Sequence, residues 1–93
     1  MGIDKKKIMT EAIEKYGQTV QKAVAMEEMG ELIMEISKNI RGLPNKSHLC
    51  EEIADVSIVL DELKIMFGLS DEDIEDEITF KLVRLNNRLK EGD

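Results

Sequence analysis

Residues 18–41 read QTVQKAVAMEEMGELIMEISKNIR, and this stretch decides the fold class. Its apolar residues recur at intervals of three and four, which is the period of an amphipathic helix and not of a strand. At about 100° per residue they fall on one stripe, formed by Ala25, Met29, Leu32, Ile33, Ile36 and Ile40. A single long helix with one core-facing side is therefore predicted here.

Three further helices are predicted around this one. The first spans 4–16 and ends at Gly17, and the third spans about 48–67. A break at 41–47, which holds the only proline, separates the second and third helices. The fourth spans about 70–90, with a serine cap and acidic residues in its first turn. Short loops favour antiparallel neighbours, so the predicted fold is all-α: an antiparallel helical bundle of about four helices.

Length and charge limit what the chain can be. Its 93 residues predict a single domain over 1–93, and so short a chain has a thin core, so we expect oligomerisation to complete the bundle. The net charge of −7 disfavours a nucleic-acid partner. There is no apolar run of about 18 residues and no signal peptide, which predicts a cytoplasmic protein without a membrane partner.

Carboxylates border the apolar stripe of the 18–41 helix. Glu28, Glu31 and Glu35 lie together directly beside the stripe, and Glu27 lies at the outer edge of this group. Like charges three and four residues apart repel one another on an isolated helix. Taken alone, the group also fits a solvated helix face, so its meaning depends on what packs against it.

The predicted helix at 48–67 carries a more informative carboxylate. Glu52 falls in the middle of its apolar face, and Asp55 falls at the edge of that face. A carboxylate inside a core must be protonated, paired or metal-bound, because burying an isolated charge is very unfavourable. If the two helices pack antiparallel, their acid pairs converge into an oxygen-rich site suited to Mg²⁺ or Mn²⁺. An ion pair of Glu52 with Arg84 or Arg88 is the alternative.

The last predicted helix carries the opposite charge beside its core face. Its three cations there are Lys81, Arg84 and Arg88. Near a hard metal ion they would suit a polyphosphate, since the metal bridges phosphate oxygens and the bases hold the remainder. The alternative is that these three cations are ordinary surface charges, which offset the acidic residues.

Together these motifs resemble a known family. Residues 27–31 (EEMGE), followed after a loop by residues 52–55 (EIAD), resemble the EExxE…ExxD signature of the MazG-like all-α nucleoside triphosphate pyrophosphohydrolases. The segment 15–17 (KYG) with Gln21, and the spacing of the three cations, look like the small single-domain members of bacteria and phages. The resemblance covers about residues 11–90.

The resemblance implies a Mg²⁺-dependent enzyme. Its reaction would cleave a nucleoside triphosphate, ribo or deoxy, between the α and β phosphates to a monophosphate and pyrophosphate. Carried over by position, the metal ligands would be Glu28, Glu31, Glu52 and Asp55. The family also works as homodimers or homotetramers, in which partner helices complete the bundle and often the site.

The remaining roles follow from the chemistry of that reaction. Glu27 or Glu35 is the candidate carboxylate base for the attacking water. The three cations, from the same or a partner chain, would neutralise the departing pyrophosphate. Tyr16 and Gln21 are the candidates on the base side, and with only three aromatic residues in the chain the preferred base stays open.

A second class of function competes with the enzyme. A non-catalytic acidic helical module could sense metal and nucleotide, or bind a basic protein surface, and the net charge of −7 suits such a role. The two classes differ in where the acids face. A module that binds a basic partner needs them outward, whereas the pattern predicts that Glu52 points inward.

Overall fold

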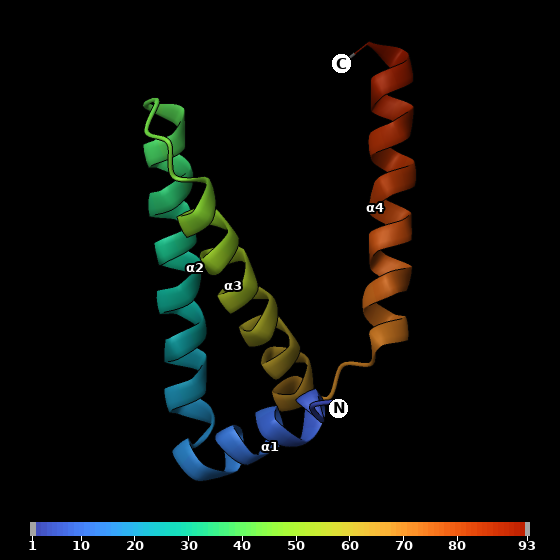
Figure 1. The fold of residues 1–93 in the computed structure, drawn as a ribbon. Coiled ribbons are helices and arrows are strands. Elements are labelled where there is room, and N and C mark those ends of the chain that lie inside the picture. Colours follow the sequence, from blue (N-terminus) through green and yellow to red (C-terminus); the bar gives the residue numbers. More distant parts are fainter. Residues whose placement is uncertain (1, 93) are drawn as a thin grey trace.

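Four α-helices joined by short turns make up the computed structural model, which describes residues 2–92 (Figure 1). In chain order they are α1 (Lys5–Tyr16), α2 (Gln18–Ile40), α3 (Lys46–Phe67) and α4 (Asp71–Glu91). No strand occurs in this part of the chain, which confirms the predicted all-α class. None of the helices within 2–92 has both the length and the apolar character needed to cross a bilayer.

A single residue joins α1 to α2. Asp4 caps α1 by accepting a hydrogen bond from the Lys7 backbone N–H at 3.1 Å, and Gly17 ends the helix. Gly17 has φ = +90°, a backbone conformation that favours glycine, and α2 begins at the next residue. The chain therefore turns sharply, and α1 lies across one end of the α2–α3 pair (Figure 1).

The α2 and α3 helices form an antiparallel hairpin (Figure 1). The loop between them ends at Asn45, which is only 6% exposed. Asn45 donates from Nδ2 to the backbone carbonyl oxygen of Glu35, so the loop is fastened to α2. Because Asn45 also accepts the first helical hydrogen bond, from the Leu49 N–H at 2.9 Å, α3 begins at Lys46, two residues before the predicted start.

The core is small and belongs to three helices. Its buried apolar residues are Ile13 from α1, Ala25 from α2 and Val59 from α3. Two buried polar residues, Gln21 and Glu62, lie on α2 and α3. Much of the predicted stripe on α2 is left uncovered: Ile33 is 66% exposed and Ile40 is 79% exposed. The thin core expected from the chain length is confirmed.

Helix α4 stands apart from the other three (Figure 1). Its start is well defined, because Ser70 and Asp73 form a reciprocal capping box. Lys64 of α3 pairs with Asp71 at 3.4 Å, close to this start. Beyond it, none of the α4 residues is buried. Ile74, near the start of the helix, is half-buried, and the other large apolar side chains are 41–69% exposed: Ile78, Phe80, Leu82, Val83, Leu85 and Leu89. Within one chain, therefore, α1–α3 pack together and α4 keeps an uncovered apolar face.

Candidate metal centre

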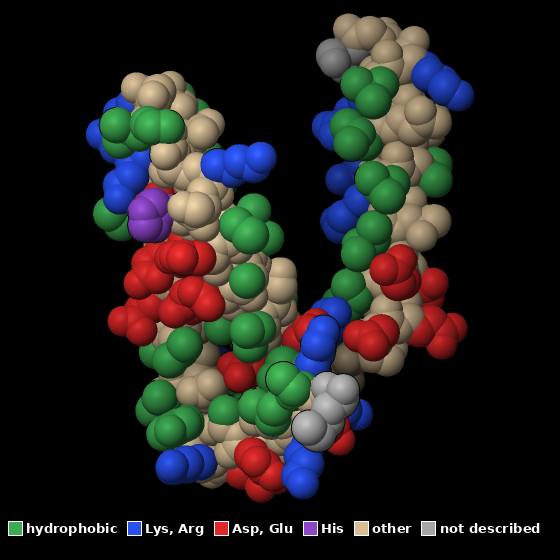
Figure 2. Space-filling view, in the orientation of Figure 1, with side chains coloured by type: hydrophobic (Ala, Val, Ile, Leu, Met, Phe, Trp, Pro, Cys, Tyr) green, Lys and Arg blue, Asp and Glu red, His purple; other side chains and the backbone are tan. Residues whose placement is uncertain are grey.

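Three carboxylates from two helices meet on the α2–α3 pair. One oxygen from each of Glu28, Glu31 and Glu52 lies within 4.8 Å of the other two. Glu28 and Glu31 are one helical turn apart on α2, and Glu52 reaches them from the antiparallel α3. Figure 2 shows acidic side chains gathered on this hairpin. The structure thus brings together three of the four predicted ligands.

Two oxygens of this cluster are buried without a partner. Oε2 of Glu28 and Oε2 of Glu52 are shielded from solvent and receive no hydrogen bond from the described residues. Burial, and then the charge of Glu31, raises the pKa of Glu28 and of Glu52 above the usual glutamate range. Nearby Asp55 raises both pKa values further. The cluster is therefore a place where a proton or a cation is favoured.

No basic side chain neutralises these carboxylates within 2–92. The ion pairs of the described chain involve other acids, so Glu52 does not pair with Arg84 or Arg88. The alternative of an internal ion pair at Glu52 is thus not formed in the single chain. What remains near Glu52 is a set of like charges, which repel one another unless a cation or proton joins them.

Asp55 adjoins the cluster without belonging to its tightest part. It is exposed, and it lies outside the group of oxygens within 4.8 Å. It nevertheless lines one small cavity together with Glu28. The fourth predicted ligand therefore sits at the edge of the cluster, in the lining of the adjoining cavity.

The two candidate bases differ in their surroundings. Glu35 accepts hydrogen bonds from Asn45 Nδ2 at 2.8 Å and from Lys38 Nζ at 2.9 Å. These bonds, that of Asn45 first, lower the pKa of Glu35. Glu27 is exposed and makes no hydrogen bond or ion pair with the described residues. Because these hydrogen bonds favour its charged form, Glu35 is a poorer proton acceptor than a carboxylate without such bonds.

The three cations lie far along α4, away from the carboxylates. Lys81, Arg84 and Arg88 are all exposed, and Arg84 lies over the Phe80 ring at 5.9 Å. Figure 2 shows the acidic side chains near the start of α4 and the basic ones further along it. Since α4 does not pack along α2 or α3, one chain alone does not bring these cations to the cluster.

A cavity of about 190 Å³ extends from the cluster between α2 and α3. Its polar lining is Gln21, Glu28, Asp55 and Glu62, and its apolar lining is Val24, Ile58 and Val59. At the end of the cavity away from Glu28, Gln21 Nε2 donates to Glu62 Oε1 at 3.0 Å. Of the two base-side candidates, Gln21 lines this cavity, whereas Tyr16 does not and is 54% exposed.

Sequence reasoning missed Glu62, although a signal was present. Asp55 and Glu62 are seven residues apart on α3, and Gln21 and Glu28 are seven apart on α2. Seven residues are nearly two helical turns, so each pair shares one helix face. In an antiparallel pair the order reverses, which places Gln21 opposite Glu62 and Glu28 opposite Asp55.

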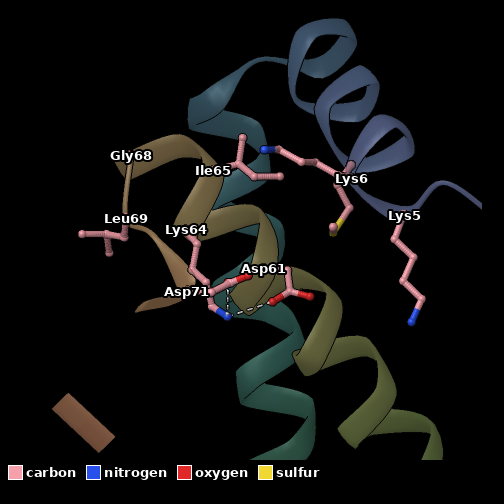
Figure 3. A pocket seen from close by; sticks show the side chains of 9 residues that line it. Lys5, Lys6, Asp61, Lys64, Ile65, Gly68, Leu69 and Asp71 are labelled. Carbon is pink, nitrogen blue, oxygen red and sulfur yellow. Dashed lines mark hydrogen bonds and ion pairs between the residues drawn. The ribbon is translucent and has the colours of Figure 1, made fainter. Parts of the chain in front are cut away.

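A second cavity, of about 420 Å³, lies where α1, α3 and the start of α4 meet (Figure 3). Lys5, Lys6 and Lys64 contribute its basic lining, and Asp61 and Asp71 its acidic lining. Lys64 Nζ lies 3.1 Å from Asp61 and 3.4 Å from Asp71. Its hydrogen bond to Asp61 raises the pKa of Lys64. This cavity shares no residue with the carboxylate cluster.

The cluster offers oxygen donors only. Carboxylate oxygens suit hard divalent cations, and two of those present here are buried and unpartnered, so the residues fit Mg²⁺ or Mn²⁺. Comparisons with known protein families, with curated proteins and with solved structures found no match for this chain.

Proposed function

We propose that this chain is a Mg²⁺-dependent nucleoside triphosphate pyrophosphohydrolase of the MazG-like type. It would cleave a ribo- or deoxynucleoside triphosphate between the α and β phosphates, and release a monophosphate and pyrophosphate. The observation that carries the proposal is the meeting of Glu28, Glu31 and Glu52, with two buried carboxylate oxygens that lack a partner. Such an arrangement is unfavourable for the empty protein and becomes favourable when a cation is bound.

Four side chains would hold the cation: Glu28, Glu31, Glu52 and Asp55. When bound, Mg²⁺ supplies charge to polarise a phosphate oxygen and to acidify water, and Mn²⁺ could substitute for it. Water oxygen attacks the α phosphorus, the bond from that phosphorus to the bridging oxygen breaks, and the water proton passes to a carboxylate. Glu27 and Glu35 remain the candidates for that carboxylate. Glu27 is the freer of the two, because hydrogen bonds engage Glu35.

The proposed active form is a homodimer, or a homotetramer built from dimers. Its support is the uncovered apolar face of α4, matched by exposed apolar residues on α2 such as Met26 (74%) and Ile33 (66%). Charge supports the same arrangement, because the later part of α4 carries Lys81, Arg84 and Arg88 and the α2–α3 pair carries the acid cluster. A second copy seated on these surfaces would deliver its Lys81, Arg84 and Arg88 to the departing pyrophosphate.

The test is pyrophosphate release from a panel of ribo- and deoxynucleoside triphosphates, each with and without Mg²⁺. Wild-type protein is expected to release pyrophosphate and monophosphate together, and only with the metal. Glu52→Gln keeps the shape of the side chain and removes its charge, and it should lower the rate at least about 100-fold. Glu51→Gln is the matched control, because Glu51 is exposed on the same helix and outside the cluster.

Each outcome of the panel has a clear meaning. Full activity of Glu52→Gln would refute the proposed site. If folded protein releases pyrophosphate from none of the nucleotides, the proposed enzymatic activity is refuted. If Mg²⁺ and nucleotide still bind in that case, the chain is a sensor that uses the same carboxylates. If neither binds, an acidic protein-interaction module is the better account.

A further inference from the structure

The cavity beside the carboxylate cluster has a second polar end that metal binding does not use. Gln21 is 7% exposed and Glu62 is 5% exposed, and both line this cavity. They are joined by one hydrogen bond, from Gln21 Nε2 to Glu62 Oε1 at 3.0 Å. Burying a carboxylate for packing alone is unfavourable, and a single neutral donor compensates for it only partly.

Both residues keep hydrogen-bonding capacity after this bond is made. Oε2 of Glu62 has no donor among the described residues, and an ionised carboxylate can only accept. Gln21 Nε2 carries a second N–H, which is free to donate. This end of the cavity therefore offers an acceptor and a donor side by side.

The position of the pair relates it to the proposed substrate. Gln21 and Glu28 are seven residues apart on α2, which is about 10 Å along the helix axis. If the α-phosphate is held at the cluster, the nucleoside is the part of the substrate that extends away from the pyrophosphate. The walls between the two ends are the apolar side chains of Val24, Ile58 and Val59, which suit the faces of a ring.

The size of the cavity limits the ring that it holds. Its volume of about 190 Å³ lies below the roughly 300–1,000 Å³ typical of sites for drug-sized ligands. A single six-membered ring suits this space better than a fused bicyclic ring. The cavity thus favours a pyrimidine base over a purine.

We infer that Glu62 and Gln21 select a cytosine base, with Glu62 Oε2 accepting from the exocyclic amino group and Gln21 Nε2 donating to the adjacent ring nitrogen. This inference rests on the proposed function, since the cluster must hold the phosphate end. Uracil and thymine present a carbonyl oxygen where cytosine presents its amino group. That oxygen would face the Glu62 carboxylate, so two acceptors would meet in a buried site. Sites that hydrogen-bond a substrate group strongly reject analogues that lack it.

The test measures binding of cytidine, uridine and adenosine monophosphates to the whole protein in Mg²⁺, by calorimetry. Wild-type protein is expected to bind cytidine monophosphate at least about tenfold more tightly than uridine monophosphate. Glu62→Gln replaces an acceptor-only group with an amide that can also donate, so the ratio should fall to within a few-fold of one. Glu51→Gln is the control and should keep the wild-type ratio. Circular dichroism shows whether each variant is folded.

The outcomes separate this inference from the proposed function. Equal binding of cytidine and uridine monophosphates by wild type would overturn it, and this measurement does not depend on the variant folding. An unchanged ratio in folded Glu62→Gln would overturn it as well, as would adenosine monophosphate binding as tightly as the cytidine form. Pyrophosphate release without any base preference would refute the cytosine site, while the proposed enzymatic activity would still stand. A cytosine preference without pyrophosphate release would refute the proposed enzymatic activity, while the cytosine-binding site would still stand. Absence of binding by all three nucleotides would overturn the inference.

Discussion

Asn45 donates from its single amide nitrogen to two oxygens of Glu35, the backbone carbonyl and Oε1, at 2.8 Å each. This contact joins the α2–α3 loop to the end of α2 and engages a glutamate that the sequence places beside the metal motif. Lys38 engages the other carboxylate oxygen of Glu35 at 2.9 Å. The result is a structural role for Glu35, and its pKa is lowered because these donors favour the charged form.

The first prediction concerns the pH dependence of this contact. Because the folded-state pKa of Glu35 is lowered, its contribution to stability is full above the ordinary glutamate pKa of about 4.3 and is lost as pH falls through the lower folded value. Asn45→Ala should therefore destabilise the protein at pH 7. The difference from wild type should shrink in acid to about 1–2 kcal/mol, because two bonds of Asn45 remain there: its donation to the Glu35 carbonyl oxygen and its acceptance from Asn39 Nδ2.

Urea unfolding of both proteins between pH 7 and pH 3 measures this difference. Asn87→Ala is the control, because Asn87 is exposed on α4 and makes none of the side-chain hydrogen bonds of the described chain. A difference that stays constant across the pH range would show that the ionised Glu35 carboxylate contributes nothing to the contact.

The second prediction concerns the metal-free cluster. The raised pKa values of Glu28 and Glu52 mean that wild-type stability falls as pH rises through them. Glu52→Gln removes one of the repelling charges, so without metal this variant should melt at a higher temperature than wild type at pH 8. The gap should narrow as the pH is lowered and the wild-type carboxylates protonate.

Adding Mg²⁺ should reverse the order of the two melting temperatures, so that wild type melts above Glu52→Gln. Ligand binding stabilises the folded state by about 2.7 kcal/mol when the ligand is at 100 times its dissociation constant. Thermal melts should therefore show wild type stabilised by Mg²⁺ and Glu52→Gln unaffected, while Glu51→Gln follows wild type. Equal stabilisation of all three proteins would mean that the ion binds somewhere else.

The third prediction concerns the uncovered face of α4. Leu85 is 41% exposed in the single chain, and burying a leucine side chain contributes about 1.5–3 kcal/mol. If a second copy covers this face, Leu85→Glu should weaken self-association by about 100-fold or more. Sedimentation equilibrium of wild type, Leu85→Glu and the control Asn87→Glu would measure it. A monomeric wild type would refute the proposed assembly.

The fourth prediction concerns whether the active site is shared between chains. Arg84→Ala should lower pyrophosphate release by about 100-fold, by the loss of a positive charge beside the leaving group. Lys90→Ala, an exposed cation on the same helix outside the trio, should leave the rate near wild type. The comparison distinguishes a specific role of Arg84 from the general charge of α4.

Mixing two inactive variants tests the sharing directly. If α4 of one chain serves the carboxylates of the other, a mixture of Arg84→Ala and Glu52→Gln protein should recover part of the activity, since some dimers then hold one intact site. A mixture as inactive as its components would place the cations and carboxylates of each site on one chain, or would exclude the cations from the site.

The amino-acid sequence alone determined the helices and much of the acid cluster. Helix ends follow from local signals such as Asp4, Gly17 and the Ser70 cap, which act within three or four residues along the chain. The same periodicity placed Glu28 and Glu31 on one face, and Glu52 on the face toward them. These features could be predicted because a helix repeats every 3.6 residues, whatever packs against it.

Tertiary structure alone decided which of these side chains have partners. Asn45 reaches Glu35 across ten residues, and Gln21 reaches Glu62 across forty-one, so both bonds depend on the register of the α2–α3 hairpin. The position of α4 likewise could not be predicted, because an amphipathic helix needs an apolar surface to cover but does not specify which one. Helical periodicity states which side of a helix is apolar, and packing between helices decides what that side meets.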